Sequence, residues 1–303
     1  MRSIYAVLLF IATVSLISCT KSTVEPDISV SDPMIVFSIE YISNTALCVM
    51  NSNGTHVIQI TEDGTWWDRY PSWSADGTKI VFCSNRETGG EWNVYSINPD
   101  GTSETRLTDN GRYNDMPTWS PDGSKIAFSS YSDGNWLNAE IYTMNADGTG
   151  ETRLTTNAWT DTAPSWSPDG TKIIFGSYEG DDWDIYRMNA NGSSVVNLTS
   201  STGFDGNASW SPDGTKIVFV SNRNGNYELY LMNADGTGQT RLTSNTYRDD
   251  HPTWTPDGTR ILYTSFGDGI ACIYSINSDG SNIFCLSNIE PPCGMPCYKG
   301  KPR

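Results

Sequence analysis

Residues 163–175 read APSWSPDGTKIIF, and close variants of this stretch recur along the chain. Its tryptophan, Trp166, has counterparts at intervals of about 45 residues. A period of this length is typical of repeat architectures in which each unit is one supersecondary element. The other four copies are YPSWSADGTKIVF (70–82), MPTWSPDGSKIAF (116–128), NASWSPDGTKIVF (207–219) and HPTWTPDGTRILY (251–263).

A second motif, of the form Asn-x-Asp-Gly or Asn-x-Asn-Gly, falls between these copies. Ser-Pro-Asp-Gly suits a type I turn, and the second motif suits a β-hairpin turn. Each unit therefore predicts four short antiparallel strands: the tryptophan strand, a KIIF-like strand, an IYTMN-like strand and a TRLT-like strand. The glycines of the second motif are Gly54, Gly101, Gly148, Gly192, Gly236 and Gly280.

These motifs resemble the TolB-type, WD-like β-propeller repeat, whose hallmark is Pro-x-Trp-Ser-Pro-Asp-Gly. The resemblance covers residues 34–287 and implies an all-β fold, a six-bladed β-propeller of four-stranded antiparallel blades. The first blade has no tryptophan strand of its own. Its missing inner strand is expected from residues 24–32 or from the C-terminal tail, residues 288–303, and the sequence does not decide between them.

The N-terminus resembles the signal of a bacterial lipoprotein. Arg2 precedes an apolar run, residues 4–17, which is too short for a comfortable membrane span. The run ends in LISC (16–19), which resembles a lipobox, and in that family cleavage leaves Cys19 as a lipidated N-terminus. Thr20 in place of aspartate then implies an outer-membrane location. The alternative is an ordinary signal peptide with an incidental cysteine.

The expected organisation is a signal peptide (1–18), a polar tether (19–33), the propeller (34–287) and a C-terminal tail (288–303) that is a candidate for closing the ring. The formal net charge is −16. This charge disfavours nucleic acid and anionic lipid as partners, because both need neutralisation by Lys and Arg. We therefore expect membrane contact only through the N-terminal lipid, and a soluble monomeric propeller.

Strand alternation predicts one face with uniform turns and an opposite face, the variable-loop face, with loops of differing length. Aromatic residues outside the repeat positions map to the variable-loop face. They are Trp66, Trp67, Trp92, Trp136, Trp159, Trp183, Tyr113, Phe204, Tyr227 and Tyr247. One polar residue, five positions before each repeat tryptophan, is expected near the mouth of the central channel. This Asp/Asn column consists of Asp68, Asn114, Asp161, Asp205 and Asp249.

Two interpretations of these residues remain open. In the first, the aromatic residues cover the ends of adjacent blades and the column caps loop amides. In the second, flat aromatic faces beside carboxylates form a ligand surface for sugars or peptides. His251, in the sequence RDDHP, belongs to the same face and is a further candidate for ligand binding.

Lipidation of Cys19 would leave six of the seven cysteines. Comparison between repeats predicts that Cys272 and Cys285 stand where other blades carry polar cross-strand partners, and we expect a disulfide there. Two buried thiols are the alternative. The pairing of Cys48, Cys83, Cys293 and Cys297 is open, and their spacing does not predict a zinc site.

The sequence favours a protein that is not an enzyme. It has two histidines, no Gly-x-Ser-x-Gly motif and no metal-ligand constellation, so we expect no catalytic residue, metal or cofactor. The expected function is a non-catalytic binding or scaffolding module of the bacterial cell envelope, engaging an envelope protein or glycan through the variable-loop face. The resemblance implies a role of this kind, because TolB-type proteins act with protein partners in envelope assembly. The alternative is a carbohydrate-directed hydrolase or lyase with its site at the channel mouth.

Overall fold

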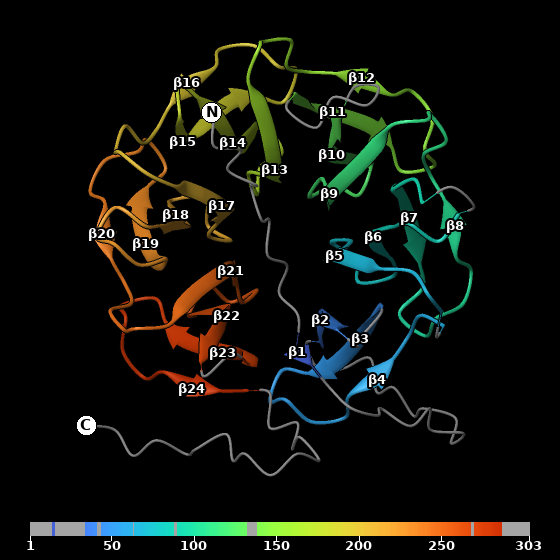
Figure 1. Ribbon diagram of the computed structural model, residues 1–303, viewed down its shortest axis with the longest axis horizontal. Coiled ribbons are helices and arrows are strands. Elements are labelled where there is room, and N and C mark those ends of the chain that lie inside the picture. The colour runs from blue at the N-terminus through green and yellow to red at the C-terminus, as the bar shows by residue number, and fades with distance from the viewer. Residues whose placement is uncertain are drawn as a thin grey trace, which may run out of the picture.

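The computed structural model describes residues 14–15, 34–40, 44–62, 64–87, 90–131, 138–267 and 270–286. Their strands form six four-stranded sheets, which stand as blades around a central axis (Figure 1). The predicted six-bladed β-propeller is therefore confirmed. Within this part of the chain we find no helix with the length and apolarity that a membrane span requires.

Each blade is built from consecutive strands, numbered in chain order. The first three blades contain β1 (Val14–Ser15), β2 (Met34–Glu40), β3 (Thr45–Asn51) and β4 (Ile58–Gln59); β5 (Asp68–Trp73), β6 (Ile80–Ser84), β7 (Asn93–Ile97) and β8 (Thr105–Arg106); and β9 (Tyr113–Trp119), β10 (Lys125–Tyr131), β11 (Ala139–Asn145) and β12 (Thr152–Arg153).

The last three blades repeat this pattern. They contain β13 (Thr160–Trp166), β14 (Lys172–Glu179), β15 (Asp182–Asn189) and β16 (Val196–Asn197); β17 (Asp205–Trp210), β18 (Lys216–Ser221), β19 (Glu228–Asn233) and β20 (Thr240–Arg241); and β21 (Arg248–Trp254), β22 (Arg260–Gly267), β23 (Ile270–Asn277) and β24 (Phe284–Cys285).

The core consists of apolar side chains shared between neighbouring blades. Phe219 of β18 is fully buried and stacks near Tyr230, with ring centroids 5.7 Å apart. In the same cluster Trp210 packs with Ile185 and Leu198 of the preceding blade. The repeat tryptophans thus serve the contact between blades, which explains their recurrence in each complete copy of the motif.

The uniform face is formed by tight turns that satisfy their own polar groups. In the second blade the Ser74 hydroxyl donates to Asp76 Oδ1 at 2.7 Å, and the amide of Thr78 donates to the same oxygen at 3.0 Å. These hydrogen bonds hold the pKa of Asp76 below its usual value. The repeated aspartates of these turns are accounted for by local structure.

The hairpin glycines have a different role. Gly148 has a φ of 86°, and a Cβ atom at this position would lie 2.5 Å from the carbonyl oxygen of Leu107 in the preceding blade. A larger residue would therefore push two blades apart as well as strain the turn.

A β-bulge interrupts the inner strand of each blade from the second to the sixth. In the third blade Thr118 lies opposite Ala127 and Asp115 opposite Ser129, so two residues of β9 face one of β10. The residue at the bulge has a left-handed backbone conformation. These residues are Tyr70, Met116, Ala163, Asn207 and His251, with φ between 49° and 53°.

The first blade differs from the expectation. Its inner position is held by β1, which pairs parallel to β2, with Val14 opposite Ile39 and Ser15 opposite Glu40. The two segments from which this strand was expected, residues 24–32 and 288–303, lie outside the described residues, so their part in closing the ring stays a prediction. The physical reason is that the open edge of β2 carries backbone groups that need partners, and the apolar segment offers an extended chain.

Candidate functional site

The aromatic residues of the variable-loop face lie at contacts between adjacent blades. Trp183 forms a backbone bridge with Phe204 of the next blade, and their ring centroids are 6.1 Å apart. Trp92 accepts a hydrogen bond from the amide of Asn114 at 3.0 Å, and its ring lies 5.4 Å from that of Tyr113. These residues occupy equivalent places in their repeats, so their first role is to join blade to blade.

These aromatic contacts continue along two rows of side chains, and each row ends in an arginine. In the first, Arg69 lies over the rings of Trp67 and Trp92, at 4.4 and 5.2 Å from the centroids. In the second, Phe204 lies 5.5 Å from Tyr227, whose ring is covered by Arg248 at 4.4 Å. Cation–π contacts of this kind stabilise the loops and fix the arginines near the inner strands.

The Asp/Asn column is buried rather than open to the channel mouth. All five residues have no exposed surface. In the fourth blade Asp161 accepts hydrogen bonds from the Ser177 hydroxyl at 2.5 Å and the Asn157 amide at 2.7 Å. Asn114 has the equivalent partners Ser130 and Asn110. The geometry therefore supports the structural interpretation of the column, which holds each loop against its inner strand.

Burial raises the pKa of three column carboxyl groups, those of Asp68, Asp161 and Asp249. The pKa of Asp161 is raised to about 6 because desolvation outweighs its hydrogen bonds to Ser177 and Asn157. Desolvation likewise raises the pKa of Asp249 to about 6, against hydrogen bonds from Ser265, Thr243 and Asn245. These shifts arise from packing between blades.

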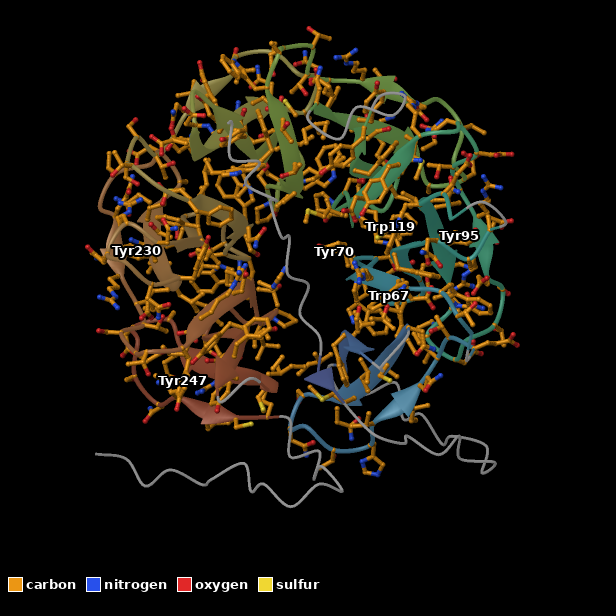
Figure 2. All side chains as sticks on the ribbon, viewed as in Figure 1. Trp67, Tyr70, Tyr95, Trp119, Tyr230 and Tyr247 are labelled. Carbon is orange, nitrogen blue, oxygen red and sulfur yellow. The ribbon has the colours of Figure 1, made fainter. Side chains whose placement is uncertain are left out.

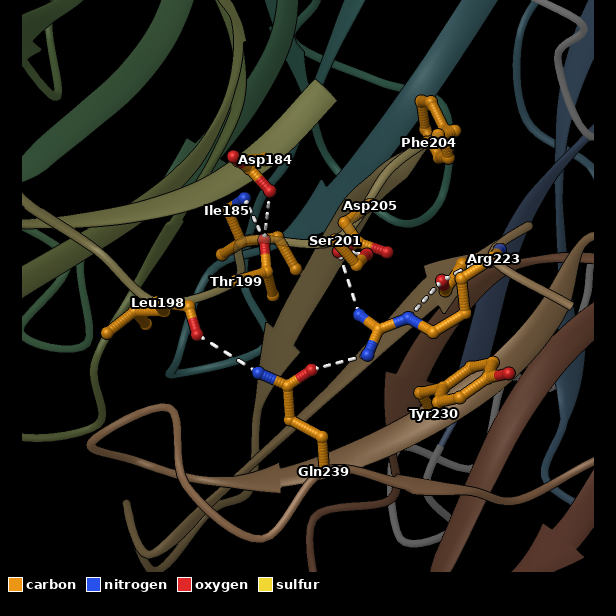
Figure 3. Close-up of polar contacts among 12 residues, drawn as sticks. Asp184, Ile185, Leu198, Thr199, Ser201, Phe204, Asp205, Arg223, Tyr230 and Gln239 are labelled. Carbon is orange, nitrogen blue, oxygen red and sulfur yellow. Dashed lines mark hydrogen bonds and ion pairs between the residues drawn. The ribbon is translucent and has the colours of Figure 1, made fainter. Parts of the chain in front are cut away.

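Figure 3 shows how such a contact is completed between the fourth and fifth blades. Arg223 forms an ion pair with Asp205 at 2.8 Å and donates to the side chain of Gln239 at 2.6 Å. Gln239 in turn donates to the carbonyl of Leu198 in the fourth blade at 3.1 Å. Asp205 thus belongs to a polar network that spans two blades.

The five bulge residues form a second set, nearer the axis of the ring, which we call the axial set: Tyr70, Met116, Ala163, Asn207 and His251. Figure 2 shows Tyr70 nearer the centre of the ring than Tyr95 of the same blade. The ring of Tyr70 lies 6.2 Å from that of His251, although these residues come from the second and sixth blades. Sequence reasoning included His251 but missed Tyr70 and Asn207. The available signal was the unlike side chains at the position preceding Pro in four of the five repeats.

Buried carboxylates support this axial set. Asp250 is fully buried and accepts hydrogen bonds from Arg248 at 2.6 Å, Asn207 at 2.7 Å and the His251 amide at 2.8 Å. Burial opposes its ionisation, but His251, Arg248 and these hydrogen bonds hold its pKa below the usual value.

Asp115 has the corresponding position in the third blade. It accepts from the Cys83 thiol at 3.0 Å and the Met116 amide at 2.8 Å, and burial raises its pKa. Both carboxylates shape a bulge and set the polarity around it.

Two aromatic residues of the variable-loop face remain exposed. Trp159 is 38% and Tyr247 41% exposed. Each is held by a hydrogen bond from its own amide to an asparagine two residues earlier, Asn157 or Asn245, at 2.7 Å. Trp66 occupies the equivalent place in its repeat, partly buried, with Arg86 5.5 Å from its ring. Trp136 lies outside the described residues.

The cysteine positions agree with the comparison between repeats. Cys285 lies opposite Tyr274, so Cys272 is its diagonal neighbour on β23. In two other blades the equivalent residues form ion pairs, Glu140 with Arg153 and Glu228 with Arg241. The disulfide between Cys272 and Cys285 stays a prediction. Cys19, Cys293 and Cys297 lie outside the described residues.

We expect the Cys272–Cys285 disulfide to resist thiol labelling in the denatured, non-reduced protein. Peptide mass mapping should recover the two peptides linked, and reduction should lower the free energy of unfolding by about 3 kcal/mol. A Cys285→Ser variant serves as the control, because reductant should not change its free energy of unfolding. Labelling of both cysteines without reductant would contradict the prediction.

No group of three or more His, Cys, Asp or Glu side chains suited to a metal ion occurs among the described residues. The axial set therefore offers hydrogen-bonding and aromatic groups, with one imidazole beside a buried carboxylate. Nδ1 of His251 lies 3.6 Å from Oδ1 of Asp250.

Comparisons with known proteins bear on the fold. The model of the TolB beta propeller domain family matches residues 11–136, 114–209 and 197–291. Among solved structures, TolB from Acinetobacter baumannii is 24% identical, with a TM-score of 0.72 over 82% of this chain and 61% of that chain. A putative TolB from Agrobacterium tumefaciens is 23% identical, with a TM-score of 0.68 over 76% of this chain and 84% of that chain.

More distant propellers include an oligogalacturonate lyase in complex with manganese, 19% identical, with a TM-score of 0.55 over 76% of this chain and 70% of that chain. A comparison with curated proteins found no match. At these identities the solved structures show a shared fold only. The chain spans 61% of the length of the Acinetobacter protein.

Proposed function

The chain belongs to the TolB beta propeller domain family, and from this we propose that it is a non-catalytic binding or scaffolding module of the bacterial cell envelope. It engages an envelope protein or glycan through the variable-loop face. The N-terminal signal exports it, the lipid on Cys19 anchors it to the outer membrane, and the propeller works as a monomer.

The observation that carries this proposal is the pair of exposed, fixed aromatic residues on the variable-loop face. Trp159 and Tyr247 expose apolar rings to solvent, while their backbones are held by Asn157 and Asn245. A rigid aromatic anchor binds with little loss of conformational entropy, and Trp and Tyr dominate the energetics of many interfaces. The same rings can stack on the apolar faces of sugars.

The axial set adds polar groups to the same proposal. Tyr70 and His251 approach each other near the axis, and Asn207 is held nearby through Asp250. These side chains offer donors and acceptors to a peptide or glycan segment that enters between the loops. The formal net charge of −16 makes neutral or basic ligands more favourable than acidic ones.

A binding experiment with matched variants tests the proposal. Titration calorimetry would measure binding of solubilised envelope proteins and peptidoglycan-derived oligosaccharides to the wild type. We expect a Trp159→Ala/Tyr247→Ala variant to bind at least about thirtyfold more weakly, because each lost anchor costs roughly 1 kcal/mol or more. The control is Val195→Ala/Val196→Ala, which removes exposed apolar groups from the outer strand region. Equal binding by the aromatic variant and the wild type would refute the proposal.

The alternative is a carbohydrate-directed hydrolase or lyase, and the contact between His251 and Asp250 favours it over other reactions. An imidazole beside a carboxylate is a common general base. Product formation from any bound oligosaccharide, lost in a His251→Ala variant that still binds, would establish this alternative and overturn the non-catalytic one.

A further inference from the structure

Arg69 differs from the other arginines that the structure describes. Seven of them form ion pairs with an Asp or Glu side chain, and Arg187 and Arg260 donate to backbone carbonyl oxygens. The guanidinium group of Arg69 has no ion pair and donates no hydrogen bond within the described part of the chain, although its Nε atom is enclosed by protein. A buried N–H group without an acceptor costs free energy, so this group is suited to an acceptor that a ligand brings.

The position of Arg69 in its repeat explains why it lacks an acidic partner. It stands immediately before the bulge residue of its blade, where the third and sixth blades have Asp115 and Asp250. In the sixth blade the arginine is Arg248, two positions before the acid, and Asp250 pairs with it at 2.6 Å. In the second blade the arginine takes the place of the acid, and Trp67 stands two positions before it. This strand therefore carries the cation without the carboxylate.

Two indole rings hold the guanidinium group of Arg69 in place. Its Cζ atom lies 4.4 Å from the ring centroid of Trp67 and 5.2 Å from that of Trp92. Both tryptophans are themselves fixed, because the amide of Trp67 donates to Asn85 Oδ1 at 2.7 Å and the carbonyl of Trp92 accepts from the amide of Asn114 at 3.0 Å. The planar fork of a fixed guanidinium group matches a carboxylate and loses little conformational entropy on binding.

The buried carboxyl group of Asp115, in the neighbouring blade, is already engaged by other donors. Its Oδ1 atom accepts from the Cys83 thiol at 3.0 Å and the Met116 amide at 2.8 Å, and its Oδ2 atom accepts from the Tyr113 hydroxyl at 3.3 Å. Desolvation raises the pKa of Asp115, and the charge of Arg69 is among the effects that oppose this rise without cancelling it. Asp115 therefore keeps its proton to a higher pH than an ordinary aspartate, and it repels an incoming carboxylate less.

We propose that Arg69 binds the terminal carboxylate of a peptide, which enters the variable-loop face beside the axial set. This inference rests on the proposed function and names one chemical group of its ligand. Tyr70, the next residue, lies nearer the axis (Figure 2), and its ring is 6.2 Å from that of His251. A peptide whose end is held by Arg69 therefore reaches the polar groups of the axial set with its next residues.

The surroundings of Arg69 favour a peptide end over an acidic sugar. The guanidinium group covers a face of each of Trp67 and Trp92, and a covered ring cannot stack on a sugar from that side. The formal net charge of −16 disfavours a ligand with many negative charges. That long-range repulsion is screened over about 8 Å at physiological ionic strength, whereas the contact with Arg69 is direct. A neutral or basic peptide with one carboxylate at its end satisfies both conditions.

Titration calorimetry with the processed full-length protein tests the carboxylate directly. The probes are the acetylated tripeptide Gly-Gly-Lys with a free terminal carboxylate, the same peptide with a terminal amide, and glucuronic acid. We expect the peptide acid to bind at least about tenfold more tightly than the amide, because the amide loses a charge-assisted hydrogen bond. The overall charge of the protein acts in the opposite direction, since the amide carries one negative charge fewer.

Three results of this titration would overturn the proposal. Equal binding of the peptide acid and the amide would exclude the carboxylate contact, and so would a failure of both peptides to bind. Tighter binding of glucuronic acid than of the peptide acid would assign the site to an acidic sugar.

A pair of matched variants locates the contact. Arg69→Met should bind the peptide acid and the amide equally. The control is Arg112→Met, which removes the same charge from an arginine that also lies over a ring, that of Tyr142 at 4.6 Å, but that pairs with Glu151. This control should keep the tenfold preference. Retention of the preference in Arg69→Met, or its loss in Arg112→Met, would refute the role of Arg69.

Two further measurements cover a variant that does not fold and separate this inference from the proposed function. In the wild type, the Nε–H resonance of Arg69, identified by its absence from the spectrum of Arg69→Lys, should shift with the peptide acid and not with the amide; an unshifted resonance would refute the contact. Trp159→Ala/Tyr247→Ala should weaken the binding of acid and amide equally. If this variant binds envelope ligands more weakly while the wild type does not distinguish acid from amide, the proposed function stands and the role of Arg69 fails.

Discussion

Replacing Asp250 with alanine is expected to lower the free energy of unfolding by about 3–5 kcal/mol. The carboxylate has no exposed surface and forms an ion pair with Arg248 at 2.6 Å. It also accepts from Asn207 and from the amide of His251. Its removal leaves these donors without their acceptor in a partly buried region, where the Arg248 side chain is 28% exposed. Denaturant unfolding followed by circular dichroism measures the change.

Asp109→Ala is the matched control for this prediction. Asp109 forms an ion pair of similar length with Arg106, at 2.6 Å, but its side chain is 82% exposed. We expect a loss of about 0–1 kcal/mol, because water screens an exposed pair and replaces it on removal. Similar unfolding midpoints for Asp250→Ala and the wild type would mean that the buried network contributes little.

Asp161→Asn is expected to stabilise the protein near neutral pH. Burial raises the pKa of Asp161 from its ordinary value of 3.8 to about 6. Well below about pH 3.9 the carboxyl group is protonated in both the folded and unfolded states. As the pH rises toward about 6, the unfolded state loses its proton first, so the stability that the protonated group contributes is lost. The shift corresponds to about 3 kcal/mol at most.

The third blade indicates that asparagine fits this position. Asn114 occupies it and accepts a hydrogen bond from Ser130, as Asp161 does from Ser177; it donates to Asn110, whereas Asp161 accepts from Asn157. Thermal melts between about pH 4 and pH 8 should show the variant and wild type converging at the acid end and diverging above it.

Asp122→Asn is the control of opposite sign for the Asp161→Asn prediction. Its carboxyl group is hydrogen-bonded to Ser120 and Ser124 in an exposed turn, and its pKa is lowered to about 2. Removing that carboxylate should weaken the protein above about pH 4, because the folded state favours the ionised form. The raised pKa of Asp161 would be contradicted by one outcome. This is that the stability of the wild type rises between about pH 4 and pH 6 by as much as that of Asp161→Asn.

The blade architecture could be predicted from the sequence because its determinants are local. Ser-Pro-Asp-Gly and Asn-x-Asp-Gly select turns by backbone conformation and short-range hydrogen bonds, as around Asp76. The alternating apolar residues of each repeat select strands. Because the repeats recur at a fixed period, the blades bury these apolar residues by packing against one another in a ring.

The site could be predicted only in part. The sequence predicted ligand binding by the variable-loop face and His251, and this stays a prediction, but most of the aromatic residues of that face, including Trp183, lie at contacts between blades. Trp159 and Tyr247 are the two that remain exposed among the described members of that set. Exposure depends on which side chain of the neighbouring blade meets each ring, and repeat position alone does not specify this.

By itself, the sequence determined the number of blades, the strand order within them and the face that carries the variable loops, because each follows from a repeated local pattern. Tertiary structure alone decided that the Asp/Asn column is buried, and that Tyr70 and His251 meet near the axis. In each of these blades the bulge residue follows the column residue by two positions in the sequence. Only a β-bulge formed against the next strand directs one inward between blades and the other toward the axis.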